Sequence, residues 1–256
     1  MKRSDGEFSL TVSRALQLVG LFSAERLELG ISELARELKL SKTSVHRLVQ
    51  ALERHQFLDH NPHTRKYRVG VEAFRVGSLF SRPLERDAEP LMRDLVANTG
   101  FTSYLSLLRN DAMVITASVE GSGRIRYSIP VGEQLPLHST ATGKAALSML
   151  EEEAVESIVK RVGLPRRTAN TTTDLRKFKG ELATVRTRGY SVNWEENTPG
   201  IASVAAPIKA AVDGVIPVVS IGFATSQADR KDVPALGARV AKAANEIGKR
   251  YRAHIA

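Results

Sequence analysis

A regular pattern of apolar and polar positions runs from residue 41 to residue 52. Four apolar residues are spaced i, i+3, i+4 and i+7, as on one face of a helix: Val45, Leu48, Val49 and Leu52. Ser41 suits the N-cap, because its hydroxyl can accept a hydrogen bond from a free N–H of the first turn. No acidic residue occurs between Ser41 and Gln50. The pattern predicts an amphipathic helix whose polar face is neutral or cationic.

The segments before this helix predict two shorter helices. Residues 14–22 have helical spacing, and residues 33–38 follow Ser32, which we expect to cap the second helix. Residues 39–41 leave room only for a tight turn. Two helices joined by such a turn, the second of them longer, form a helix-turn-helix.

The segments after the third helix predict a β-hairpin. Residues 57–60 and 65–69 can form strands, and Asn61-Pro62 between them is a turn signal. The second strand is basic, with Arg65, Lys66 and Arg68. A helix-turn-helix followed by a basic hairpin is typical of a winged helix. The cations of its wing would lie along DNA phosphates, where they give affinity without reading sequence.

Residues 70–80 predict a further helix that connects the two halves of the chain. A small winged helix has little spare core to cover Phe74, Leu79 and Phe80, so these residues are available to pack on a second copy of the chain. The best candidate for a linker is Ser81-Arg82-Pro83, because proline restricts the residue before it.

The second half of the chain contains further predicted helices. Pro90 suits a first helical turn, Gly100 suits a C′ position, and Thr173 suits an N-cap. The expected helices cover residues 90–98, the end of segment 135–147, residues 151–162, residues 174–188 and the C-terminal stretch that carries Leu236, Val240, Ala243 and Ile247.

Strands are predicted between these helices, in residues 101–108, 113–119, 124–129, 189–194, 201–211 and 215–223. Asp213-Gly214 separates the last two and is a strong hairpin signal. Strands mixed with helices, together with an antiparallel hairpin, indicate an α+β fold. At 256 residues the chain is long enough for one large domain or two ordinary ones.

The net charge of the chain and its distribution indicate what kind of partner the protein binds. The formal net charge is +9, and the window from residue 39 to residue 68 holds seven cations against two anions. Such an excess favours a polyanionic partner such as double-stranded DNA. The chain has no apolar run near the ~20 residues of a membrane span, and its N-terminus lacks the apolar core of a signal peptide. We therefore expect a cytoplasmic protein that does not contact membranes.

Catalytic and metal chemistry have little support in the sequence. There is no cysteine, which excludes disulfides and thiolate ligands, so His55, His60 and His63 are weak evidence for a metal site. Gly143-Lys144 resembles part of a P-loop but lacks its first glycine and its Ser or Thr. Glu195-Glu196 is expected to serve solvation or capping, and His138 beside Ser139 a structural role. We expect no enzyme, no cofactor and no metal.

From Leu10 onward the chain resembles the IclR family of bacterial transcriptional regulators. The matching motifs are Ser13-Arg14-Ala15-Leu16, residues 40–48, Leu135-Pro136-Leu137-His138 with Gly143-Lys144, Gly189-Tyr190, Glu195-Glu196, Pro199-Gly200-Ile201 and Ala205-Ala206-Pro207. The resemblance implies a winged helix-turn-helix in residues 8–70, a linker helix in 71–86 and an effector-binding domain in 87–256. That domain would be a GAF-like, mixed α/β structure with an antiparallel sheet.

The resemblance also implies a mode of DNA binding. A homodimer or a dimer-of-dimers tetramer would bind a near-palindromic operator and control catabolic genes. The residues expected to meet the DNA groove are Lys42, Thr43, Ser44, His46, Arg47 and Gln50. Arg65, Lys66 and Arg68 would meet phosphates.

Carried over by position, the effector pocket of the family would comprise Arg124, Tyr127, Leu135, Ala141, Thr142, Asn193, Ser203 and Ser220. Many members have Asp where this chain has Asn193, and Cys where it has Ser203. Trp194, the only tryptophan, should face away from Asn193 because side chains alternate along a strand. Arg124 and Tyr127 suggest an aromatic carboxylate, since a guanidinium pairs with carboxylate and rings stack.

The function predicted in this way is that of a ligand-responsive regulator, a repressor or an activator, that binds a small organic or aromatic acid. The sequence leaves open which acid it binds and the sign of regulation. An alternative is a small-molecule enzyme or storage domain with a head that binds nucleic acid nonspecifically.

Overall fold

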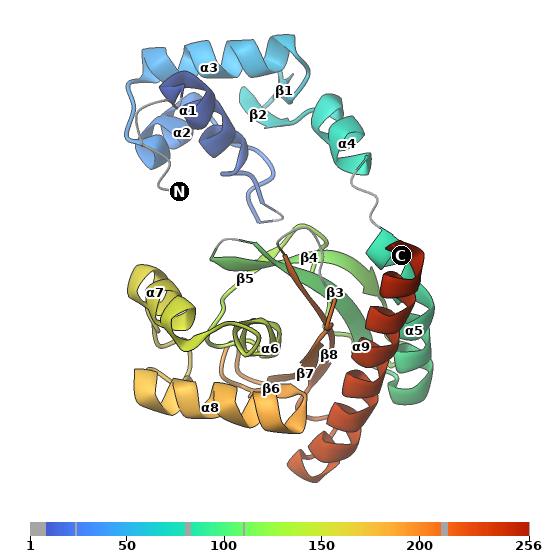
Figure 1. Cartoon of the computed structure of the whole chain (residues 1–256). Coiled ribbons are helices and arrows are strands. Elements are labelled where there is room, and N and C mark those ends of the chain that lie inside the picture. The colour runs from blue at the N-terminus through green and yellow to red at the C-terminus, as the bar shows by residue number, and fades with distance from the viewer. Residues whose placement is uncertain (1–8, 24, 80–82, 110, 211–214, 256) are drawn as a thin grey trace. The chain divides into compact units, whose positions relative to one another are not determined.

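Two compact units, residues 1–81 and 82–256, make up the chain in the computed structural model (Figure 1). The structure describes residues 9–23, 25–79, 83–109, 111–210 and 215–255. Among the helices in these ranges, none is long and apolar enough to cross a membrane.

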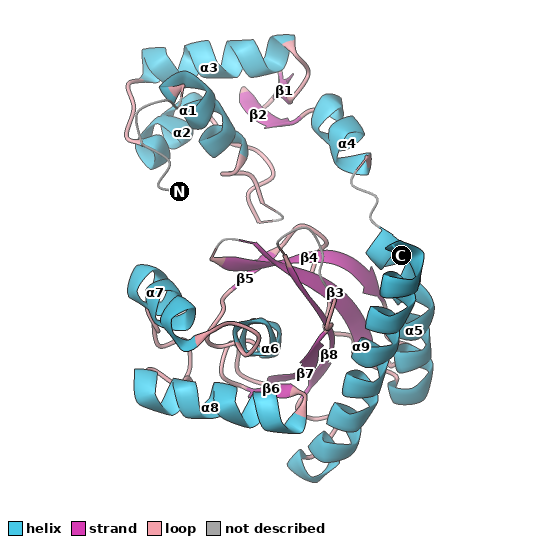
Figure 2. Cartoon of the chain, in the orientation of Figure 1, coloured by secondary structure: helices cyan, strands magenta, loops and turns pink. Residues whose placement is uncertain are grey.

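Three helices and a hairpin form the winged-helix part of the N-terminal unit, before the connecting helix (Figure 2). Its elements are α1 (Leu10–Val19), α2 (Ile31–Leu38), α3 (Lys42–Arg54), β1 (Leu58–Asn61) and β2 (Lys66–Val69). The apolar stripe of α3 packs into a shared core with Leu18, Leu34 and Leu58. β1 pairs antiparallel with β2, and Leu29 bridges Tyr67 on the other side of β2. The predicted winged helix is confirmed.

One of the three predicted N-cap residues is confirmed, and two are replaced by a neighbouring residue. Ser41 caps α3 as predicted, because its Oγ accepts the Ser44 N–H at 3.2 Å. The prediction for α2 was wrong: Gly30 is the N-cap, and the Glu33 carboxylate reaches back to the Gly30 N–H at 2.7 Å. α8 (Leu175–Arg188) is capped by Asp174 rather than Thr173, because the Asp174 carboxylate accepts the Lys177 N–H at 2.7 Å.

The predicted connecting helix is α4 (Val71–Ser78), none of whose residues is buried. It is shorter than the expected 71–86, and α5 (Pro83–Thr99) is a separate helix. Phe80, Ser81 and Arg82 lie outside the described residues. Pro90 lies inside α5 instead of in its first turn. The helix begins earlier because Leu84, Ala88 and Met92, spaced four residues apart, all pack in the core and offset the hydrogen bond that proline cannot make.

The C-terminal unit is built on a six-stranded antiparallel sheet of order β5-β4-β3-β8-β7-β6. Its strands are β3 (Thr102–Arg109), β4 (Ala112–Val119), β5 (Gln134–Leu135), β6 (Ser191–Trp194), β7 (Ile201–Pro207) and β8 (Ile216–Ala224). β7 and β8 pair as the hairpin signal predicted, while Asp213-Gly214 lies outside the described residues.

Helices cover both faces of this sheet (Figure 1). α5 and α9 (Val233–Ile255) pack on one face, and α9 buries Leu236, Val240, Ala243 and Ile247 as predicted. The opposite face carries α6 (Ala141–Leu147), α7 (Glu152–Val162) and α8. The short η1 (Arg230–Asp232) leads into α9. The α+β prediction is confirmed.

One predicted strand does not form. Residues 124–129 lie outside every strand, and the edge of the sheet is β5 instead. The backbone of this segment is bonded by a side chain: the Tyr104 hydroxyl donates to the Tyr127 carbonyl at 2.6 Å and accepts the Ile129 N–H at 3.2 Å. The Tyr104 side chain therefore supplies two of the backbone hydrogen bonds that a neighbouring strand would otherwise supply.

Candidate functional site

The polar face of α3 collects six predicted residues on one exposed surface: Lys42, Thr43, Ser44, His46, Arg47 and Gln50. Val45, Leu48 and Val49 are buried on the opposite face and fix the orientation of the helix. Within the described part of the chain, neither Lys42 nor Arg47 forms an ion pair. The face therefore offers two cations and several hydrogen-bonding groups directly to solvent.

The three cations predicted for the wing differ in their exposure to solvent. Arg65 and Arg68 are exposed, but Lys66 is half-buried, with its Nζ 3.2 Å from a Glu33 carboxylate oxygen. Glu28 accepts hydrogen bonds from Asn61 and Thr64, at 2.7 and 2.8 Å, and these bonds lower its pKa. Two acids that precede the basic window in sequence thus brace the turn and partly neutralise Lys66.

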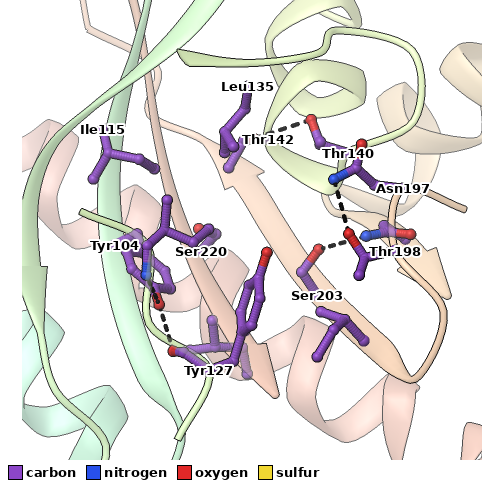
Figure 3. A pocket seen from close by; sticks show the side chains of 15 residues that line it. Tyr104, Ile115, Tyr127, Leu135, Thr140, Thr142, Asn197, Thr198, Ser203 and Ser220 are labelled. Carbon is purple, nitrogen blue, oxygen red and sulfur yellow. Dashed lines mark hydrogen bonds between the residues drawn. The ribbon is translucent and has the colours of Figure 1, made fainter. Parts of the chain in front are cut away.

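The C-terminal unit contains a small cavity of about 30 Å³ beside the sheet (Figure 3). This is the space of about one or two water molecules, so a larger ligand would have to displace some of the side chains that line the cavity. It is lined by Tyr104, Ile115, Tyr127, Ile129, Leu135, Thr140, Thr142, Asn193, Asn197, Thr198, Ile201, Ser203, Ser220, Ile221 and Gly222. These residues include hydroxyls, amides and apolar groups but no Asp, Glu, His, Lys or Arg.

Most of the predicted effector residues meet at this cavity. Six of the eight line it: Tyr127, Leu135, Thr142, Asn193, Ser203 and Ser220. Arg124 does not line it and is exposed, because the segment that carries it is not a strand. Ala141 is fully buried in the core between α6 and the sheet. The structure therefore places these two residues outside the cavity.

Several lining residues were missed from the sequence, above all Tyr104. Tyr104 lies in the buried strand β3, and its hydroxyl forms hydrogen bonds with the backbone of Tyr127 and Ile129. Burial raises the pKa of Tyr104 to about 12. Thr140, Asn197 and Thr198 were also missed, because they lie in loops and at a helix cap that no periodicity marks.

The polar lining is connected by hydrogen bonds. Asn193 donates from Nδ2 to Ser203 Oγ at 3.3 Å, and its Oδ1 accepts the Glu196 N–H at 2.8 Å. Asn197 Oδ1 accepts the Ser139 hydroxyl at 3.0 Å. Because Ser203 Oγ is the acceptor in its bond with Asn193, its hydrogen is available to a ligand oxygen. The hydrogen-bonding groups that the cavity offers are therefore hydroxyls and amides, which carry no formal charge.

Two family models match the chain. The IclR helix-turn-helix domain matches residues 11–62, and the C-terminal domain of the bacterial transcriptional regulator IclR matches residues 76–249. The chain belongs to the IclR family of bacterial transcriptional regulators.

Individual members of the IclR family match over most of the chain. The acetate operon repressor of Salmonella typhimurium is 33% identical, with 94% of this chain and 89% of the repressor covered. An IclR transcriptional regulator from Alicyclobacillus acidocaldarius has a TM-score of 0.85 at 26% identity, covering 96% and 100%. A homologue from Microbacterium hydrocarbonoxydans, complexed with 4-hydroxybenzoate, shares the fold with a TM-score of 0.79 at 21% identity, covering 95% and 99%.

The relatives in the IclR family are transcriptional regulators and not enzymes, as predicted. His138 and Ser139 do not form a nucleophile pair: His138 Nε2 is 2.8 Å from the Pro165 carbonyl, and Ser139 bonds Asn197. In the described ranges no group of three or more His, Asp or Glu residues could hold a metal ion.

The expected role of Glu195-Glu196 needs correction in this IclR-family protein. Glu195 accepts the Gly200 N–H at 2.9 Å, as a capping residue would. Glu196 is not a solvating residue: its side chain is 13% exposed and forms an ion pair with Lys144 at 2.6 Å. The pairing joins residues 52 positions apart, which no local pattern could indicate.

Proposed function

We propose that this IclR-family protein is a cytoplasmic, ligand-responsive regulator that reads a near-palindromic operator with α3. The exposed α3 face from residue 42 to residue 50 has no acid and, in the described structure, no ion pair at Lys42 or Arg47, and this observation supports the proposal. Arg47, Thr43 and Ser44 lie near the N-terminal end of the helix, where recognition helices contact base edges. Arg65 and Arg68 would contact phosphates, with a weaker contribution from Lys66 because of Glu33.

A near-palindromic operator requires two copies of the chain, and the apolar surface of the N-terminal unit supports a dimer. Phe74 and Leu79 are 75% and 70% exposed at α4, and Leu10 and Leu16 are 61% and 68% exposed on α1. These apolar side chains are open to solvent and are available for contact with a second copy of the chain. We propose that they pack in a homodimer, which could pair further into a dimer of dimers.

The effector proposed for the cavity is a small organic acid. A related fold carries 4-hydroxybenzoate, which makes this acid the first probe to try. In this chain its oxygens would be held by neutral donors such as Tyr127, Ser203 and Ser220. Binding would bias the dimer or tetramer geometry and thereby the spacing of the two α3 helices, a coupling of ~1–3 kcal/mol.

DNA binding upstream of the chain's own gene tests this function. The binding reaction would be titrated with salt and compared with a scrambled duplex of equal length. We expect a protected near-palindrome that is preferred by ~10³ or more. Equal, steeply salt-dependent binding to both duplexes would instead show counterion release alone and would contradict the proposal.

A further inference from the structure

A second polar cluster lies beside the cavity, around Lys144 of α6. The Lys144 side chain is 4% exposed, and its Nζ is 2.6 Å from both Glu196 carboxylate oxygens and 2.9 Å from Glu181 Oε2. An unpaired buried ammonium would cost several kcal/mol, so these two carboxylates fix where Lys144 can lie. Lys144 does not line the cavity.

The two carboxylates come from different parts of the fold. Glu181 belongs to α8 and accepts a second hydrogen bond from Thr172 Oγ1 at 2.6 Å. Glu196 belongs to the segment between β6 and β7, whose next two residues, Asn197 and Thr198, line the cavity (Figure 3). Of the two carboxylates, only that of Glu196 therefore belongs to a segment that forms part of the cavity wall.

This wall segment needs external support. Glu195 has φ of 58°, in the left-handed region that a residue other than glycine adopts at a cost. Thr168 donates to the Glu195 carbonyl at 2.6 Å, and Thr171 donates to the Glu196 carbonyl at 2.7 Å. From the cavity side, Asn193 accepts the Glu196 N–H. The Lys144 ion pair is the charged contact among these.

We propose that Lys144 is a positioning residue for the effector cavity, where its buried pair with Glu196 holds residues 195–200 in the wall. This inference rests on the proposed role of the cavity as the effector site. It gives the Gly143-Lys144 motif a function other than phosphate binding. A ligand that contacts Asn193 or Asn197 would therefore contact the wall segment whose position the Lys144–Glu196 ion pair fixes relative to α6.

Glu196→Gln and Glu181→Gln form a matched pair for a test. Each variant leaves Lys144 with one carboxylate, so both should fold, but only Glu196→Gln weakens the arm that reaches the cavity. Hydrogen exchange would be measured on the ligand-free full-length protein. We expect exchange of residues 195–200 to accelerate about tenfold in Glu196→Gln and to stay within about twofold in Glu181→Gln.

The single tryptophan supplies a second readout. Trp194 packs against the core on the α9 side, as strand alternation predicted, and Arg230 lies 4.9 Å from its ring. We expect its emission to change in Glu196→Gln and not in Glu181→Gln. Unchanged exchange in Glu196→Gln, or equal loosening in both variants, would overturn the proposal and give Lys144 a general structural role.

Titration with 4-hydroxybenzoate separates this inference from the proposed function. If the acid binds the wild type, we expect its affinity to fall about tenfold in Glu196→Gln and to hold within about twofold in Glu181→Gln. Equal affinities in both variants would contradict positioning by Lys144. Absence of binding to the wild type would count against this acid as effector, while the exchange result would still decide the role of Lys144.

Discussion

The α3 face and the cavity place charge in opposite ways. The α3 face keeps Lys42 and Arg47 in water, where a charge costs little and can meet a polyanion. The cavity is lined by hydroxyls, amides and apolar groups. Where the same unit does bury a cation, at Lys144, it supplies two carboxylates to hold it. The cavity that we propose as the effector site is therefore lined by neutral groups, and the buried charges lie beside it rather than in its lining.

The largest effect should come from the close packing around the cavity. A Cβ at Gly143 would lie 2.2 Å from the Leu137 carbonyl oxygen, so the backbone must shift to accept Gly143→Ala. We expect this variant to lower the free energy of unfolding of the C-terminal unit by ~3 kcal/mol, measured by denaturant titration. The α3 face, which is open to solvent, contains no such constraint.

Gly180→Ala is the matched control for this prediction. Gly180 lies within α8, and a Cβ there meets no atom within 4 Å. Because alanine is the better helix former, we expect this variant to raise stability by ~0.5–1 kcal/mol. Equal losses in both variants would show that the fit between Gly143 and Leu137 is not the constraint.

The next effect concerns sequence reading by the α3 face. We expect Arg47→Ala to cost roughly 1–3 kcal/mol on the cognate operator and to relax base preference at one position. Binding to a set of single-base operator variants, measured at fixed salt, would show this.

Arg68→Ala separates base reading from phosphate contact. Arg68 is exposed on β2, so its loss should weaken binding to all sequences alike and reduce the salt slope by about 1. If Arg47→Ala behaves in the same way, Arg47 is a phosphate contact and the α3 face reads sequence through other side chains.

Much of this contrast was predictable from local sequence. The stripe from Val45 to Leu52 and the cap at Ser41 depend on neighbouring residues, so they gave α3 its place and orientation correctly. The predicted strand at residues 124–129 failed because Tyr104, twenty or more positions away, bonds that backbone. Periodicity cannot register such a contact.

The cavity was predicted in part for the same reason. Asn193 and Ser203 were identified through family resemblance and do meet, since they face each other across β6 and β7. Asn197 and Thr198 lie in a loop that is held by Lys144 through Glu196, and tertiary pairing of this kind leaves no spacing pattern. The sequence therefore indicated the exposed charges of α3 but not the buried ion pair of Lys144 and Glu196.

A buried and an exposed histidine allow a smaller test. Burial lowers the pKa of His138, because the charged imidazolium loses water. The unfolded chain binds this proton near pH 6.5, whereas the folded protein binds it only at lower pH. We therefore expect the contribution of His138 to the free energy of unfolding to be constant above pH 6.5. It should decrease as the pH drops from 6.5 toward the lower pKa that His138 has in the folded protein. Chemical denaturation between pH 7.5 and pH 5.5 would measure the loss.

His138→Gln identifies the group responsible. Glutamine can still donate to the Pro165 carbonyl but does not titrate, so the loss below pH 6.5 should shrink in this variant. His63→Gln changes an exposed ring in the wing turn and serves as the control. An unchanged pH profile in His138→Gln would assign the loss to other groups.

The smallest effect is expected at Arg124, which family resemblance suggested as a partner for the effector carboxylate. Arg124 is exposed and does not line the cavity, whereas the Tyr127 ring does. We expect calorimetry with a bound acid to give Arg124→Ala an affinity within about twofold of the wild type, and Tyr127→Phe a loss of about five- to tenfold for one hydrogen bond. A larger loss in Arg124→Ala would mean that a charge enters the cavity on binding, and the contrast between a charged DNA-binding face and a neutral cavity would then hold only for the ligand-free protein.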